Sequence, residues 1–354
     1  MIKILHSADW HLCSPLSSLA EHLRQPLLQA LNTLPEQVAQ ICRQENCDLV
    51  LLSGDIFDGP CTTEIRLSLY RALEGMQVPV FISPGNHDPI HPDSPWVSFP
   101  WPENVHIFSS GEITSVAVSG LDCRVWGAAF TGMDCPSLLE GFHPEQTERY
   151  AIGLFHGDPA DPDSPYNPIT AAQVSDTGLD YLALGHIHKR GQFFSGSTLC
   201  AWPGCPIGRG FDEAGQKGLL VTTLDQTCQT QFVPLDVPRF YDQEVPVDGD
   251  PARALAAFLP PIPGKDIYRL TLTGRCESFD PELLQKEFPH NLQLRNRTLP
   301  PIDTWSALGQ DSLEGVLFQL LKEQTLSEDP SIRRQATLAA ELTRQLLDGE
   351  EVTL

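Results

Sequence analysis

The sequence has few basic side chains for its length. Its 354 residues include 46 acidic and only 23 basic side chains, which gives a formal net charge of −23 at pH 7. A freestanding protein that binds nucleic acid without sequence preference usually carries a basic surface, because neutralised phosphates supply most of its affinity. The composition therefore excludes this class unless the basic surface is local.

Long apolar runs and paired cysteine motifs are also missing. No segment approaches the roughly 18 to 20 uncharged apolar residues of a membrane-spanning helix, and the apolar stretch at 2–5 is too short for a signal peptide. We therefore predict a cytoplasmic protein without a membrane span. The ten cysteines contain no C-x-x-C pair, which disfavours a zinc ribbon. We expect them to be mostly reduced, with Cys13 a packed thiol.

Strand and helix signals alternate over the first two thirds of the chain. Apolar residues at helical spacing predict helices at 26–44 and 63–75. This alternation is typical of a layered α/β domain with a mainly buried sheet. Short β-rich runs that end in polar clusters predict buried strands at 2–6, 49–53, 78–83, 152–155 and 181–184.

The composition changes near Asp236, where prolines become frequent. We therefore predict a body at 1–235, a small α/β cap at 236–300 and a helical segment at 301–354. Leucine stripes in the last segment predict amphipathic helices that pack on the body or on a partner. The elements expected in the cap are helices at 251–258 and 281–288 and a strand at 266–273.

Polar clusters occur at the ends of the predicted strands, where the ligands of open α/β sites collect. Asp, Asn and His together suit manganese, iron or zinc. Seven such ligands are too many for one tetrahedral ion but fit two ions that share a carboxylate. The clusters are Asp9-Trp10-His11, Gly54-Asp55-Ile56-Phe57-Asp58, Gly85-Asn86-His87-Asp88, His156-Gly157-Asp158 and Gly185-His186-Ile187-His188. The seven ligands are Asp9, His11, Asp55, Asn86, His156, His186 and His188.

Two metals about 3.5 to 4 Å apart stabilise both the attacking and the leaving oxygen of a phosphoryl displacement. The pattern therefore predicts hydrolysis of a phosphate ester. We expect Gly54, Gly85 and Gly185 to let the backbone approach the site closely. His6 points to the other side of its strand end, so we expect it to be a structural hydrogen bonder.

These clusters, in this order, resemble the signature of the calcineurin-like metallophosphoesterases over roughly residues 1–205. The run 6–12, with Gly-Asp-Ile-Phe-Asp and Gly-Asn-His-Asp, is similar to the SbcD-type branch of DNA repair nucleases. The stretch 203–218 resembles the YhaO-like subgroup of exonucleases. The resemblance implies a four-layer metallophosphoesterase β-sandwich flanked by helices, with a small α/β cap and C-terminal helices.

The resemblance also implies roles for single residues. The His87 position protonates the leaving oxygen or stabilises the transition state, and Asp58 would hold His87 as an imidazolium. Some nucleases of this branch carry His in place of Asp58, so that role is a hypothesis. Arg209 and Lys217 are candidate phosphate contacts, or equally surface charges. One metal would be held by Asp9, His11, Asp55 and His188, and the other by Asp55, Asn86, His156 and His186.

On this basis we predict a manganese-dependent DNA phosphodiesterase, an exonuclease with some endonuclease capacity in DNA repair. The resemblance implies an SbcC-like or YhaN-like SMC-type ABC ATPase as partner, and a homodimer is left open. A phosphatase or small-molecule phosphodiesterase on the same core is the alternative. Gly59 and Asp88 disfavour it, because serine/threonine phosphatases usually carry Arg and Glu there. A silent scaffold for the ATPase is disfavoured by the complete set of ligands.

Acidic charge is spread unevenly along the chain. Residues 1–235 contain 11 basic and 26 acidic side chains, residues 236–300 contain 8 and 10, and residues 301–354 contain 4 and 10. Two divalent cations would offset part of the charge of the body. We therefore predict weak, metal-dependent DNA binding by the isolated chain. The DNA-facing arginines are expected in the near-neutral cap: Arg269, Arg275, Arg295 and Arg297.

Overall fold

A computed structural model describes residues 1–145 and 147–349 and divides the chain into two compact units. The first unit contains Met1–Asp242 and Gly264–Tyr268, and the second contains Gln243–Pro263 and the chain from Arg269 onward. The division at 235 and 300 stays a prediction. Among the described residues, no helix combines the length and the apolar character that a bilayer crossing requires.

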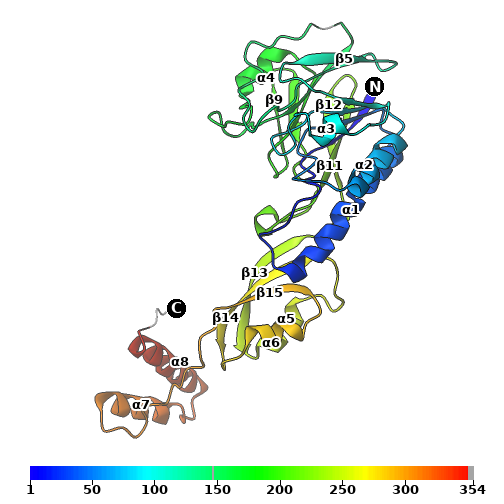
Figure 1. Cartoon of the computed structure of the whole chain (residues 1–354). Helices are drawn as coiled ribbons and strands as arrows, with labels where there is room; N and C mark the ends of the chain where they lie inside the picture. Colours follow the sequence, from blue (N-terminus) through cyan, green and yellow to red (C-terminus); the bar gives the residue numbers. More distant parts are fainter. Residues whose placement is uncertain (146, 350–354) are drawn as a thin grey trace. The chain divides into compact units, whose positions relative to one another are not determined.

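Two six-stranded sheets form the first unit (Figure 1). The first sheet has the order β12-β11-β1-β2-β3-β4, with β1 to β4 parallel and the β11-β12 edge antiparallel. Its strands are β1 (Ile2–Ser7), β2 (Leu49–Leu52), β3 (Val80–Ile82), β4 (Val105–Ile107), β11 (Gly218–Leu224) and β12 (Cys228–Pro234).

The second sheet has the order β5-β6-β7-β8-β10-β9, parallel from β6 to β10 with antiparallel strands at both edges. Its strands are β5 (Thr114–Val118), β6 (Cys123–Gly127), β7 (Tyr150–His156), β8 (Tyr181–Gly185), β9 (Gly191–Ser195) and β10 (Thr198–Trp202). The five strands predicted from the sequence correspond to β1, β2, β3, β7 and β8. The sequence did not predict the other strands of the two sheets, which include the edge strands β4, β5, β9 and β12 and the interior strands β6, β10 and β11.

Alternate side chains of a strand face opposite sides of its sheet, and here both sides are covered. In β2, Leu51 packs between the two sheets, whereas Leu52 packs toward α1 (Glu21–Gln44) and α2 (Thr63–Gly75). In β8, Ala183 packs between the sheets and Leu182 packs toward α4 (Ala171–Thr177). The layers are therefore helix, sheet, sheet and helix, which confirms the four-layer α/β sandwich.

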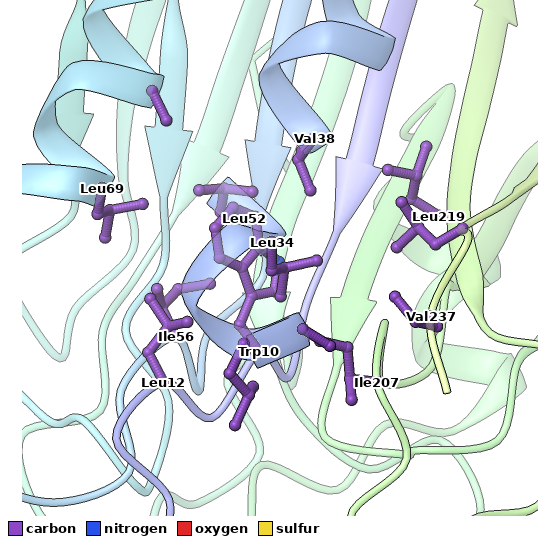
Figure 2. Packing of buried hydrophobic residues seen from close by; sticks show 14 of the residues in the cluster. Trp10, Leu12, Leu34, Val38, Leu52, Ile56, Leu69, Ile207, Leu219 and Val237 are labelled. Carbon is purple, nitrogen blue, oxygen red and sulfur yellow. The ribbon is translucent and has the colours of Figure 1, made fainter. Parts of the chain in front are cut away.

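Buried side chains from strands, loops and helices form the core beneath α1 and α2 (Figure 2). Trp10 is 1% exposed and lies in the same cluster as Leu34 and Val38 of α1. Helix α1 begins at Glu21, five residues before the predicted start, because Leu23 continues its buried stripe. Helix α2 has the predicted bounds.

The second unit contains most of a three-stranded sheet, two short helices and a helix pair. Its helix α5 matches the prediction, and α6 ends two residues before the predicted end. In the helix pair, Phe318 and Ala340 are buried in one shared cluster. The elements are β13 (Phe240–Gly249), α5 (Pro251–Phe258), β14 (Ile267–Cys276), α6 (Pro281–Lys286), β15 (Asn291–Asn296), α7 (Leu313–Gln324) and α8 (Pro330–Leu347).

One cysteine pair differs from the expectation. A disulfide joins Cys13 to Cys61, with a Cα–Cα distance of 5.6 Å, whereas the eight other cysteines are free. The prediction that Cys13 is a packed thiol is therefore wrong. A parallel bridge between Leu12 and Phe57 brings the two loops side by side, and no local pattern in the sequence indicates that pairing.

Candidate metal centre

The polar clusters meet at one edge of the sandwich because they follow the carboxyl ends of parallel strands. Asp9 and His11 follow β1, Asp55 follows β2, and Asn86 follows β3. The second sheet contributes from β7 and β8 in the same way: His156 is the last residue of β7, and His186 and His188 follow β8.

Apolar residues between the polar ones anchor the first two loops. Trp10, Leu12, Ile56 and Phe57 are each at most 1% exposed and lie in the core cluster under α1 (Figure 2). Backbone hydrogen bonds join the loops along their length, for example from Leu12 N to Ile56 O at 2.8 Å. Buried apolar side chains and backbone hydrogen bonds therefore fix the backbone of the loops that carry the polar side chains.

The backbone at the site is in an uncommon conformation. Asp9, His11, Asp55 and His186 have φ values of 54°, 48°, 51° and 90°. Left-handed backbone costs a residue with a side chain about 1 kcal/mol or more, and such residues cluster at functional sites. Tertiary contacts hold these four residues in place despite that cost.

The three glycines beside the site are required by close packing. A Cβ atom at Gly54 would lie 2.6 Å from His156 Nδ1, and one at Gly85 would overlap Asp55 Oδ1. A Cβ atom at Gly185 would overlap the carbonyl oxygen of Ser53. The expectation that these glycines permit close approach is confirmed.

Asp55 lies at the centre of the cluster and is 1% exposed. Its Oδ2 is 3.4 Å from His156 Nε2 and 3.9 Å from His11 Nε2, and its Oδ1 accepts a hydrogen bond from His87 N at 2.8 Å. Asn86 Oδ1 lies 3.0 Å from the same His156 nitrogen. A carboxylate between two groups of imidazoles has the position of a bridging ligand.

The donor atoms also fit cations. The Nδ1 of His156 lies 2.8 Å from the Ser53 carbonyl and donates to it, so the Nε2 lone pair faces two oxygens, those of Asp55 and Asn86. The Oδ2 of Asp9 is buried without a partner among the described residues. The Nε2 atoms of His11 and His188 lie 3.1 Å apart. Buried carboxylate, amide and imidazole donors that converge in this way are suited to hold a divalent cation.

Burial and neighbouring charges shift the pKa values of the candidate ligands. Burial raises the pKa of Asp9 to about 6, and it lowers the pKa of His11 to about 3 and that of His186 to about 4. Burial also acts to lower the pKa of His156, but the charge and hydrogen bond of Asp55, the charge of Asp9 and the bond to Ser53 together outweigh it and raise that pKa to about 9. His11 and His186 are therefore neutral at pH 7, the form in which imidazole binds a metal ion.

His87 differs from the buried residues because its side chain is 40% exposed. Its Nδ1 donates to Asp58 Oδ1 at 3.1 Å, and this bond raises the pKa of His87 and lowers that of Asp58 to about 2. Arg209 Nη1 donates to Asp58 Oδ2 at 3.2 Å. The His87 ring lies 4.8 Å from the His11 ring, measured between centroids. The bond to Asp58 therefore stabilises the protonated form of His87, whose ring faces solvent at the rim of the cluster.

Three acidic residues contribute in ways that the sequence analysis did not assign. Asp88 accepts four backbone N–H bonds, from Asp55 and Gly85 on Oδ1 and from Ile56 and Phe57 on Oδ2. Glu213 Oε1 accepts from His188 Nδ1 at 2.6 Å, and Asp158 Oδ2 lies 3.9 Å from His186 Nε2. The motif Gly-Asn-His-Asp contains Asp88, but its contacts to another loop are invisible in the sequence.

Lys217, the other candidate phosphate contact, is not part of the cluster of buried ligands. Lys217 is 8% exposed, and its Nζ donates to Cys205 Sγ at 3.2 Å. It lines a pocket of about 710 Å³ together with His188 and Arg190.

His6 forms side-chain bonds to Tyr181 and Ser53 and is fully buried, so its predicted structural role is confirmed.

Residues 2–190 match the family model of the calcineurin-like phosphoesterases. The chain belongs to this family. Among curated relatives, the chain is 29% identical over 231 residues to the uncharacterized metallophosphoesterase YhaO of Bacillus subtilis, covering 61% of this chain and 56% of that protein. It is 26% identical over 258 residues to the SbcD component of the nuclease SbcCD of the same organism, covering 60% and 64%.

The chain thus spans less than two thirds of the length of these two calcineurin-like relatives. A dimetal phosphatase from Danio rerio is similar in structure, with 11% identity, a TM-score of 0.41 and coverage of 65% of this chain and 95% of that one. Members of the calcineurin-like family bind divalent metals, and the structure contains candidate ligand groups such as Asp9, Asp55 and His156.

Proposed function

We propose that the chain is a two-metal phosphodiesterase that hydrolyses DNA in repair. The observation that carries the proposal is the convergence of buried carboxylates and imidazoles, with Asp9 Oδ2 and His11 Nδ1 buried without a hydrogen-bond partner among the described residues. Membership of the calcineurin-like phosphoesterase family supports ester hydrolysis as the reaction. The similarity to a protein named as part of a nuclease supports DNA as the substrate.

We assign the ligands to two groups that share Asp55. Asp9, His11 and His188 would complete one group, and Asn86, His156 and His186 the other; the closeness of Asp9 to His11 and His188 and of Asn86 to His156 supports this division. When bound, two divalent ions, manganese by preference and iron or zinc as alternatives, would supply an acidified water and neutralise charge on the phosphate.

The protein itself positions the proton and the ligands. His87, held as an imidazolium by Asp58, would donate its Nε2 proton to the leaving oxygen. Glu213 keeps the Nδ1 proton of His188 in place, which directs the Nε2 lone pair toward His11. Arg209, bonded to Asp58, supplies a positive charge within reach of the phosphate.

The proposal assigns contacts with the substrate and with a partner to the segments that follow the metallophosphoesterase body in the chain. We assign DNA contacts to the cap, whose exposed Arg295 and Arg297 lie in or next to β15.

We assign binding of an SbcC-like or YhaN-like ATPase to α7 and α8, where large apolar side chains are exposed. These are Leu313, Val316, Leu317, Leu320, Ile332, Leu338, Leu346 and Leu347. We expect the Leu320→Glu variant to lose co-purification with the ATPase and to hydrolyse small esters at an unchanged rate. Retained binding of the ATPase would argue against the assignment.

Hydrolysis assays with manganese test the main proposal. The substrates are linear duplex, single-stranded and hairpin DNA, with bis-p-nitrophenyl phosphate as a simple diester. We expect turnover of DNA, lost by about 100-fold or more in His87→Ala. His143→Ala is the matched control, because this exposed histidine bonds only to Asp176 O among the described residues. Turnover confined to phosphomonoesters or nucleotides would overturn DNA as the substrate, and absence of metal and turnover would favour a scaffold.

A further inference from the structure

A second cavity borders the candidate centre on the side of His87. It has a volume of about 390 Å³, which is within the range of small-ligand pockets. His87 lines this cavity, and its ring also contacts His11 of the ligand cluster. A group bound in the cavity would therefore lie next to the residue that faces the leaving oxygen.

Arg66, in the first part of α2, is the only Lys or Arg among the described residues that line this cavity. Its Nη2 donates to Thr63 Oγ1 at 3.4 Å, and its guanidinium lies 5.5 Å from the centre of the Phe99 ring. The Nε is buried and has no hydrogen-bond partner within the described part of the chain. Its long side chain is held by packing while its charge has no counter-ion among those residues.

The acidic residues that line the cavity, Asp88 and Asp93, form no ion pair with Arg66 within the described part of the chain. Both carboxylate oxygens of Asp88 are occupied by backbone N–H groups of the two neighbouring loops. Asp93 lines the cavity as well, but it is exposed and forms no ion pair with Arg66 among residues 1–145 and 147–349. In a chain with twice as many acids as bases, this cation stays available for an external anion.

A second polar group without a partner lies in the same lining. Ser94 is 1% exposed, and its Oγ forms no hydrogen bond within the described residues. Its backbone N–H is already used by His91 O, so the hydroxyl is the free donor. A guanidinium and a hydroxyl from separate segments, α2 and the chain after β3, thus line one cavity with unused bonding capacity. Phosphate oxygens match both donors.

We propose that Arg66 and Ser94 bind a second phosphate of the substrate, next to the scissile one on the leaving-group side. This inference rests on the proposed function and adds a substrate requirement to it: two consecutive phosphate groups, as in an oligonucleotide. An isolated phosphodiester fills only the metal centre and does not reach Arg66. The same phosphate chemistry can come from a nucleic-acid backbone or from a terminal phosphate.

Matched dinucleotides isolate the second phosphate. The manganese-loaded full chain is assayed on TpT, which has a single phosphodiester, and on pTpT and TpTp, which add one terminal phosphate. We expect kcat/KM to be about tenfold or more higher for one of the phosphorylated dinucleotides than for TpT. Arg66→Gln should abolish this preference and leave TpT hydrolysis unchanged, and Arg66→Lys should restore part of it. The control is Arg71→Gln, an exposed arginine of the same helix outside the cavity.

Each outcome decides one question. Equal kcat/KM for TpT and both phosphorylated dinucleotides, or equal losses on all three in Arg66→Gln, would overturn the inference while leaving the proposed function intact. If neither TpT nor bis-p-nitrophenyl phosphate is hydrolysed, the proposed function fails. The inference is then decided by calorimetric dissociation constants for TpT, pTpT and TpTp, where equal affinities overturn it. Arg66 dependence with longer oligothymidylates assigns the second phosphate to a backbone, and dependence with the dinucleotides alone assigns it to a terminus.

Discussion

At the scale of single residues, burial separates the candidate ligands from His87, the proposed proton donor. Asp9, Asp55 and His156 are each 1% exposed, whereas the His87 side chain is 40% exposed. A buried imidazole cannot exchange protons with a substrate as readily as one at the rim. The same contrast explains why the bond to Asp58 raises the pKa of His87, while burial lowers that of His11.

The pH dependence of catalysis tests the pair of Asp58 and His87. The protonated imidazole is the donor, so activity should be lost as pH rises through its raised pKa. Asp58→Asn removes the negative charge that strengthens this bond and helps to raise the pKa of His87, so the alkaline limb of the pH–rate profile should move to lower pH. Turnover at alkaline pH should fall about 10- to 100-fold. Glu64→Gln, an exposed neutralisation in α2, is the control. An unchanged profile in Asp58→Asn would falsify the pairing.

At the scale of elements, the loops after β2 and β3 are joined by one carboxylate. Asp88 follows β3, and three of its four backbone bonds go to the loop after β2, at Asp55, Ile56 and Phe57. The sequence predicted both strands and both loops from their apolar runs and polar ends. It did not predict this bond or the disulfide between Cys13 and Cys61, because both join segments that are distant in the chain.

Replacing Asp88 measures the strength of that connection. In Asp88→Asn, an amide NH₂ would face backbone N–H groups that now donate to a carboxylate oxygen. We expect the free energy of unfolding to fall by about 1.5 to 3 kcal/mol. Denaturant unfolding followed by fluorescence gives this value, with Asp93→Asn as the exposed neighbouring control. Equal stability of the two variants would show that the four bonds are dispensable.

At the scale of the whole molecule, the excess of acidic residues predicts weak DNA binding by the proposed nuclease. Metal-free protein should bind a duplex at physiological salt no more tightly than a dissociation constant of roughly 10⁻⁶ to 10⁻⁴ M. Manganese should tighten binding, because divalent ions offset carboxylates at the point where phosphate enters. Fluorescence anisotropy with a labelled duplex measures this, and a double Asp9→Asn, Asp55→Asn variant should lose the gain. Tight binding by metal-free wild type would contradict the prediction.

Local patterns in the sequence determined the α/β class, the five central strands, helix α2 and the identity of the polar clusters, because apolar periodicity and strand-end positions depend on neighbouring residues. Only the tertiary structure decided which clusters meet. It brought Asp55 within 3.4 Å of His156, a residue about a hundred positions away, and left Asp9 Oδ2 without a partner among the described residues. It also decided the role of Asp88 and the surroundings of Arg66, since the partners of a carboxylate or guanidinium are the groups that packing places around it.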